Sequence, residues 1–436
     1  MQQKLSNHIN KKFPFLKDKK LLIAVSGGID SVALTHLLSI LNFNISLAHC
    51  NFNLRQKESD LDEVFVKELG EKLSIKVFTT HFNTEKFAKE NKQSTQIAAR
   101  ELRYNWFQEL IENYKFNYVL TAHHADDNLE TFLINLTRGT GLEGLTGIPE
   151  INGNIVRPLL KFSRDEVLTF AKGNNINWRE DKSNASTKYT RNKIRHQILP
   201  ILKEINPSLL ETFAKTTDHL KDSQQIIEDR IEKISSEIIE KEKDVIKIEI
   251  EKINRLLNPK AYLYQLLKTY NFTEWNDISA LLSAQSGKQV FSKTHILLKD
   301  RDFLLLSKRN LSTALEKEFQ IDKNTSEITK PINLKFEEVK EKSTENKQSI
   351  YVDKQGLIFP LQLRKWQNGD FFYPKGMKGK KKLSKYFKDE KYSLLEKQNT
   401  WLLCNHNNAI IWIIGKRQDN RFKITKNTTS IIKVSF

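Results

Sequence analysis

The sequence contains little cysteine, since Cys50 and Cys404 are the only two in 436 residues. Two cysteines cannot build a disulfide framework, and one chain cannot form a four-cysteine zinc or iron–sulfur site from them. Glycine and proline are also scarce, at 15 and 9 residues, and no long Pro/Gly/Ser tract occurs. Hydrophobic residues make up 39% and charged residues 28% of the chain, a composition that argues against a wholly disordered protein.

Long hydrophobic runs are absent as well. The first twenty residues are basic but lack the apolar segment of a secretion signal, and the longest apolar run, 409–414, is far too short to span a membrane. We therefore expect a soluble protein of the reducing cytoplasm with no membrane partner. The length predicts two or three domains.

Positive charge is in excess and is unevenly distributed. The net charge is +18, of which residues 1–200 carry about +6, residues 201–360 about 0 and residues 361–436 about +12. A general bias toward lysine would spread the excess along the chain. Its concentration at one end predicts a polyanion-binding module there.

Short apolar runs alternate with helical patterns between residues 20 and 130. Strands are expected at 21–25, 45–48, 77–78 and 118–122, and helices at 32–41, 61–73 and 95–113. This alternation predicts an α/β fold with a doubly wound, mainly parallel sheet. Ligands of such sheets bind beyond the carboxyl ends of the strands.

Three regions are expected along the chain. Residues 1–205 form the catalytic α/β domain, residues 206–340 a mainly helical middle domain that ends in a linker, and residues 350–436 a small, basic α+β domain. The linker is expected within the charged stretch 316–348, and β-hairpin material at 289–307.

A glycine-containing turn follows the first strand directly and opens a helix. It reads Ser26-Gly27-Gly28-Ile29-Asp30-Ser31. Glycines allow a tight turn, and backbone N–H groups, a helix N-terminus and two serine hydroxyls suit phosphate oxygens. The spacing and the missing lysine exclude a Walker A loop. The alternative is a purely structural turn.

A second polar motif, His123-His124-Ala125-Asp126-Asp127-Asn128-Leu129-Glu130-Thr131, follows the strand at 118–122. Asp127 and Glu130 would share one face of a helix that starts here. Such paired carboxylates could bind Mg²⁺ or a cationic amine. The alternative is an acidic helix start favoured by the helix dipole.

Basic side chains lie near these motifs in the sequence. Arg100 and Arg103 would share a helix face and reach phosphate or a developing anion, and Arg191 and Arg195 belong to a cluster suited to RNA backbone. The alternative for each pair is a solvated basic helix surface.

Taken together, these motifs resemble the bacterial tRNA(Ile)-lysidine synthase family, within the ATP pyrophosphatase (PP-loop) enzymes. The order of motifs is SGGIDS, His49…Asn51…LR…ES, ARELRY, HHADDNLET, TRGTG, RPL, EDKSN and RNKIRH, followed in the tail by GDFFYPKGM, KKKLSKYF and WIIGKR. Phe52 departs from the pattern, because many relatives have a polar residue or histidine there. We therefore assign no catalytic role to this stretch, Cys50 included.

The resemblance implies a ligase that joins free L-lysine to C2 of the wobble cytidine in the CAU-anticodon tRNA(Ile). ATP adenylates the base and pyrophosphate leaves, then the lysine amine attacks and AMP leaves. Ser26 to Ser31 would hold ATP, Asp127 and Glu130 the lysine, and Asp30 and Asp127 Mg²⁺. Asp30, Arg103, Asp127 and Glu130 would be the catalytic residues.

The resemblance also implies that the basic tail binds tRNA. The lysines expected there are Lys375, Lys380, Lys381, Lys382 and Lys385, in addition to Arg191 and Arg195. A homodimer stays open. The competing functions are a sulfur-inserting tRNA enzyme of the same PP-loop type, a small-molecule ligase, and a non-catalytic tRNA-binding protein.

Overall fold

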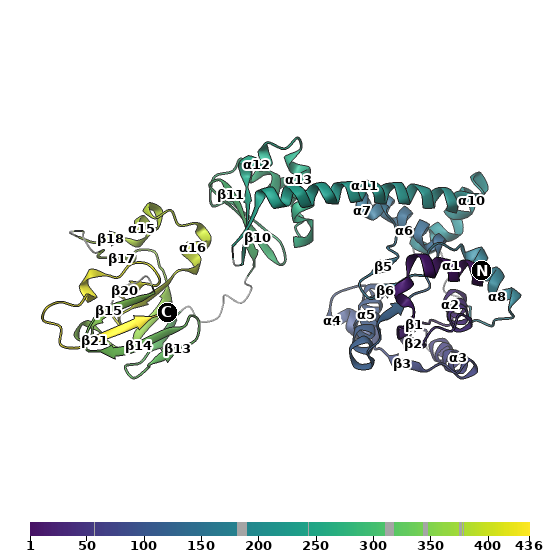
Figure 1. Ribbon diagram of the computed structural model, residues 1–436, viewed down its shortest axis with the longest axis horizontal. Helices are drawn as coiled ribbons and strands as arrows, with labels where there is room; N and C mark the ends of the chain where they lie inside the picture. The colour runs from purple at the N-terminus through teal and green to yellow at the C-terminus, as the bar shows by residue number, and fades with distance from the viewer. Residues whose placement is uncertain are drawn as a thin grey trace. The chain divides into compact units, whose positions relative to one another are not determined.

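The computed structural model describes residues 1–55, 57–180, 190–242, 244–309, 318–342, 348–374, 377 and 379–436 (Figure 1). The chain divides into two compact units, Met1–Asp229 and Arg230–Phe436. No helix in the described ranges combines the length and apolar character needed to cross a membrane.

The first unit is built on a six-stranded sheet with the order β3-β2-β1-β4-β6-β5. Neighbouring strands are parallel except for the β5–β6 hairpin. The strands are β1 Leu21–Ala24, β2 Ile45–Asn51, β3 Val77–His81, β4 Tyr118–Leu120, β5 Ile151–Asn152 and β6 Ile155–Val156. The expected α/β fold with a mainly parallel sheet is therefore confirmed.

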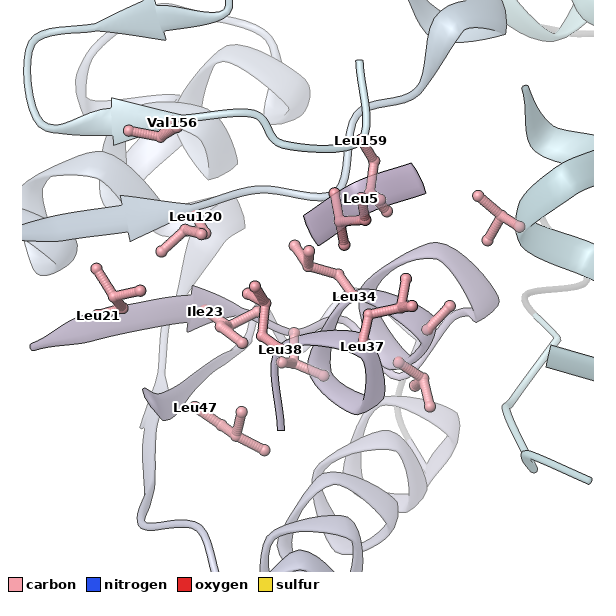
Figure 2. Packing of buried hydrophobic residues seen from close by; sticks show 14 of the residues in the cluster. Leu5, Leu21, Ile23, Leu34, Leu37, Leu38, Leu47, Leu120, Val156 and Leu159 are labelled. Carbon is pink, nitrogen blue, oxygen red and sulfur yellow. The ribbon is translucent and has the colours of Figure 1, made fainter. Parts of the chain in front are cut away.

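Helices cover both faces of this sheet because alternate strand residues point to opposite sides. Leu21 and Ile23 pack in one core with Leu34 and Leu37 (Figure 2), whereas Leu22 packs on the other face. The helical elements of this unit are α1 Gln2–Lys12, η1 Pro14–Leu16, α2 Ile29–Ile40, α3 Lys57–Leu73, α4 Thr84–Glu90, α5 Thr95–Tyr114, α6 Ala125–Arg138, α7 Leu142–Leu145, α8 Arg164–Gly173, α9 Thr190–Lys193, the π-helix η3 Ile194–Ile198 and α10 Leu199–Ile205.

The long helix α11, Leu209–Ile238, leads to a five-stranded antiparallel sheet with the order β7-β8-β11-β10-β9. This sheet packs with short helices around a core of its own. The elements are β7 Ile239–Glu242, β8 Val245–Glu249, α12 Ile250–Asn254, α13 Pro259–Leu267, η4 Lys268–Tyr270, α14 Trp275–Ala280, β9 Gln289–Phe291, β10 His295–Asp300 and β11 Phe303–Lys308.

The remaining described residues form two four-stranded sheets, β12-β16-β19-β20 and β13-β14-β21-β15, and the small β17–β18 pair. Their elements are β12 Glu318–Ile321, β13 Glu327–Ile328, β14 Leu334–Val339, β15 Ser349–Asp353, η5 Lys354–Gly356, β16 Leu361–Lys365, β17 Phe371–Phe372, β18 Lys381–Lys382, α15 Leu383–Asp389, α16 Leu394–Asn399, β19 Trp401–Cys404, β20 Ile410–Ile413, η6 Asn420–Phe422 and β21 Ile431–Ser435.

Three strands, β12, β13 and β14, lie within the charged stretch 316–348 in which the linker is expected. β12 pairs with β16, and β14 pairs with β21. Strand pairing with distant segments satisfies the backbone of a sequence whose own periodicity is weak. We therefore propose that the C-terminal domain begins at β12 and not at residue 350.

Candidate active site

The turn after β1 has the geometry of a phosphate cradle. Gly27 has φ +89°, a backbone conformation that disfavours other residues, and Gly28 precedes the first turn of α2. The Ser31 hydroxyl donates to the Gly28 carbonyl at 3.0 Å and accepts from the Ser26 amide at 3.2 Å. These bonds hold the loop of Ser26 to Ser31 in a fixed shape at the carboxyl end of β1, as the sequence predicts.

A cluster of ion pairs beside this loop stabilises its position. Sequence spacing does not indicate this cluster. The Arg179 amide donates to the Gly27 carbonyl at 3.0 Å. The Arg179 side chain donates to Asp62 at 2.5 Å and to Glu58 at 2.7 Å, and Arg55 donates to Asp62 at 2.6 Å. Asp62 is buried on α3, so one carboxylate holds both guanidinium groups beside the turn.

Asp62→Asn is expected to weaken ATP binding about tenfold, because it leaves Arg55 and Arg179 without their shared buried carboxylate. The loop then loses part of its fastening to α3. Isothermal titration with a non-hydrolysable ATP analogue measures the change. The matched control is Lys67→Met, which removes an ion pair with Glu63 on the same helix. Equal affinity of Asp62→Asn and the control would contradict this role.

The second motif begins α6, whose N-cap is His124. The Asp127 carboxylate accepts from the His124 amide at 3.1 Å, and the Asp127 amide donates to Nδ1 of His124 at 3.4 Å, which completes a capping box. This bond leaves Nε2 of His124 facing Asp127 at 3.4 Å and Asp30 at 3.7 Å. His124 thus connects the phosphate loop with the acidic helix start.

Glu130 and Asp127 grip a guanidinium group. Nε of Arg195 lies 2.5 Å from Glu130 Oε1, and Nη2 of Arg195 lies 3.0 Å from Glu130 Oε2 and 2.9 Å from Asp127 Oδ1. Nε of Arg191 lies 3.2 Å from the same Glu130. Both arginines are expected tRNA contacts, and that role stays a prediction. Sequence spacing does not reveal this pairing, which joins residues on α6 to the π-helix η3 and α9.

Burial and neighbouring charges separate the pKa values of these groups. Burial raises the pKa of Glu130 despite the opposing effect of Arg195. Burial also acts on Asp127, but the neighbouring His124 and Arg195 favour its ionised form and lower the Asp127 pKa overall. Burial lowers the pKa of His123 to about 4, so this imidazole is neutral near pH 7.

Asp30 fits a magnesium ligand better than Asp127 does. Oδ1 of Asp30 is buried without a hydrogen-bond partner in the described part of the chain, and burial raises the pKa of Asp30. Mg²⁺ commonly takes one or two carboxylates together with substrate phosphates and water. Both oxygens of Asp127, in contrast, already accept hydrogen bonds. No cluster of three or more His, Cys, Asp or Glu ligands occurs among the described residues.

Arg103 lies on α5 at the carboxyl edge of the sheet, its guanidinium 5.1 Å from the ring centre of Phe52. Arg100 instead packs over Tyr104 at 4.8 Å. Cys50 and Cys404 are both free, and burial raises the pKa of each thiol to about 12. Neither thiol is therefore prepared to act as a nucleophile.

The predicted basic surface of the tail lies around β18 and α15. Lys380, Lys382 and Lys385 are exposed, whereas Lys381 pairs with Asp389 at 2.8 Å. Lys375 lies outside the described residues. Of the aromatic residues near these lysines in the sequence, Phe372, Tyr386 and Phe387 are core residues, and Phe371 is exposed. The exposed groups of this surface suit phosphate contacts better than base stacking, and tRNA binding here stays a prediction.

Comparison with known proteins places these features in one context. Three family models match the chain, the PP-loop domain over residues 1–202, the TilS substrate binding domain over 241–309 and the TilS substrate C-terminal domain over 361–434. A distant likeness in fold to the U34-tRNA thiolase NcsA of Methanococcus maripaludis has a TM-score of 0.41 and 20% identity over 50% of this chain and 78% of that chain. It carries no argument about chemistry.

Curated relatives match along their whole length. The tRNA(Ile)-lysidine synthase of Parabacteroides distasonis is 42% identical and that of Bacteroides thetaiotaomicron 40% identical, with coverage of 96% and 99% of both chains. The enzyme of that name from Clostridium perfringens is 32% identical, over 100% of this chain and 99% of its own. Full-length similarity at this level confirms the resemblance of the motifs, and the chain belongs to the tRNA(Ile)-lysidine synthase family of PP-loop enzymes.

Proposed function

We propose that the protein joins free L-lysine to C2 of the wobble cytidine of the CAU-anticodon tRNA(Ile), with ATP as co-substrate. The observation that carries this function is the full-length similarity to proteins named tRNA(Ile)-lysidine synthase. The product is lysidine, and AMP and pyrophosphate are released. The enzyme is then a ligase that forms a carbon–nitrogen bond. Its tRNA and ATP substrates place it in the cytoplasm.

In the adenylation step, the loop Ser26 to Ser31 binds the phosphates that leave as pyrophosphate. Its backbone amides and the N-terminus of α2 stabilise their negative charge. Asp30 is the residue that would hold Mg²⁺, which neutralises phosphate charge when bound. The fastening of Gly27 by Arg179 keeps the amides in place while the charge of the leaving group develops.

In the lysine-transfer step, Asp127 and Glu130 bind and orient the ε-amine of the substrate. Their grip on Arg195 supports this role, because it demonstrates that the pair binds a cation at hydrogen-bond distance. The ammonium of lysine shares or takes over this position from the arginine. Two carboxylates near the amine also favour its positioning and loss of a proton before attack.

Sulfur insertion is the competing function within PP-loop enzymes, and the thiols argue against it. Such chemistry generally uses a pair of reactive cysteines or a cluster site. Cys50 is half-buried and Cys404 is buried, and burial raises the pKa of each to about 12, so the thiolate is disfavoured at neutral pH. The unit that contains the phosphate loop therefore provides a phosphate cradle and carboxylates but only one thiol, which is unreactive.

The function is tested by incubating purified protein with ATP, Mg²⁺, labelled lysine and a CAU-anticodon tRNA(Ile) transcript. We expect label in the tRNA, with AMP and pyrophosphate formed in equal amounts. A transcript with cytidine 34 replaced by uridine is the control and should remain unlabelled. Absence of label, or sulfur transfer or small-molecule ligation in its place, would reject the proposal.

Lysine transfer is expected to decline on the acid side at a higher pH than an exposed glutamate, whose pKa is about 4.3, would produce. Burial raises the pKa of Glu130, so protonation removes its charge before an exposed carboxylate would respond. Activity falls as the pH falls because only the ionised Glu130 carboxylate attracts the ammonium of lysine. Single-turnover transfer from pre-adenylated tRNA, followed from about pH 4 to 8, measures the position of the limb. An acid limb at or below that of an exposed glutamate would contradict the assignment.

A further inference from the structure

Phe52 lies against Arg103, a candidate catalytic residue. It directly follows β2, whose carboxyl end lies beside the phosphate loop. There, the amide of Val25, directly after β1, donates a hydrogen bond of 2.9 Å to the Ala48 carbonyl on β2. Nδ1 of His49 lies 2.9 Å from the Val25 carbonyl. Phe52 therefore belongs to the ligand-binding edge of the sheet.

The ring and the backbone of Phe52 both contact the segment after β3. It stacks on Phe82 with ring centres 5.7 Å apart and an interplanar angle of 26°. The Phe82 amide donates to the Asn51 carbonyl at 2.8 Å, and the Thr84 hydroxyl donates to the Phe52 carbonyl at 2.9 Å. Side chain and backbone contacts thus fasten the segments after β2 and β3 to each other.

Arg103 lies over the Phe52 ring. Its guanidinium is 5.1 Å from the Phe52 ring centre, within the range of a cation–π contact. No carboxylate forms a salt bridge with Arg103 in the described ranges. An arginine side chain has many rotamers, and a planar ring restricts them while leaving the N–H donors free. The ring therefore orients this guanidinium in place of an ion pair.

We infer that Phe52 is a positioning residue for Arg103, and that it holds the guanidinium ready for a phosphate or the activated base. The inference rests on the proposed function and on the expectation that Arg103 reaches phosphate or a developing anion in it. The contact itself is independent of which reaction the site performs.

The test combines kinetics with a direct readout of the contact. Phe52→Leu should lower kcat/KM for lysine transfer about threefold to thirtyfold, whereas Phe52→Tyr should stay within about twofold of the unchanged protein. In an Arg103→Lys background, Phe52→Leu should cost less, because the planar stacking partner is already lost. Phe15→Leu is the matched control, since Phe15 packs on Tyr118 at the amino end of β4.

Protein labelled with ¹⁵N-arginine separates failure of this inference from failure of the proposed function. The Arg103 Nε–H signal, assigned by its loss in Arg103→Lys, should move downfield in Phe52→Leu and stay in place in Phe52→Tyr. An unmoved signal, or losses for Phe52→Leu and Arg103→Lys that multiply fully, would overturn the positioning role. Lack of lysine incorporation by the unchanged protein, with the signal still ring-shifted, would reject the function and leave the contact established.

Discussion

Glu130→Gln is expected to reduce lysine transfer by about a thousandfold or more, with ATP affinity changed by less than about threefold. The substitution keeps the volume of the side chain but removes the charge that faces Arg195 at 2.5 and 3.0 Å. Glu130 is fully buried, so solvent does not screen the lost attraction. Transfer from pre-adenylated tRNA and titration with an ATP analogue measure the two effects separately.

Asp127→Asn provides the second variant, because Glu130→Gln leaves Arg195 with one carboxylate and could lower stability by itself. Asp127→Asn should also abolish lysine transfer. Thermal unfolding shows whether each of the two variants remains folded. Glu112→Gln on α5 is the control, an exposed carboxylate with a single bond to Gln108. Full activity in both Asp127→Asn and Glu130→Gln would show that the lysine site lies elsewhere.

The position of the site could be predicted from sequence because its parts lie next to recognisable strands. SGGIDS follows an apolar run, and HHADDNLET follows another, so parallel strands bring both motifs to one edge. The three-residue spacing of Asp127 and Glu130 also gives their common helix face. Local rules of this kind depend only on neighbouring residues, which the sequence displays directly.

The partners of these residues could not be predicted in the same way. Arg195 meets Glu130 across 65 positions, and Arg179 meets Asp62 across 117. Such pairs depend on how distant segments pack, and surface arginines usually remain solvated. Strands β12 and β14 could not be predicted for a similar reason, since their pairing with the distant β16 and β21 outweighs their weak periodicity.

The basic tail leads to the second large effect, and the strand order determines how it is tested. Truncation from residue 361 should weaken tRNA binding, but it would also remove β16 and β21. β12 and β15 would then lose the strands they pair with, and β14 would keep only β13. A lower tRNA affinity of the truncated protein would then reflect unfolding of the domain as well as the loss of charge. Substitution of exposed lysines avoids this problem, because their side chains do not belong to the core.

A variant with glutamine at Lys380, Lys382, Lys385 and Lys388 should bind the tRNA(Ile) transcript about tenfold to a hundredfold more weakly at low salt. Each phosphate contact that is lost should reduce the slope of log affinity against log salt by about 0.7 to 0.9. ATP affinity should not change. Glutamine at Lys11, Lys12, Lys17 and Lys19, which are also exposed, gives a control with the same change in net charge. If both variants weaken tRNA binding equally, the excess charge acts through its total amount and not through a tRNA-binding surface on the tail.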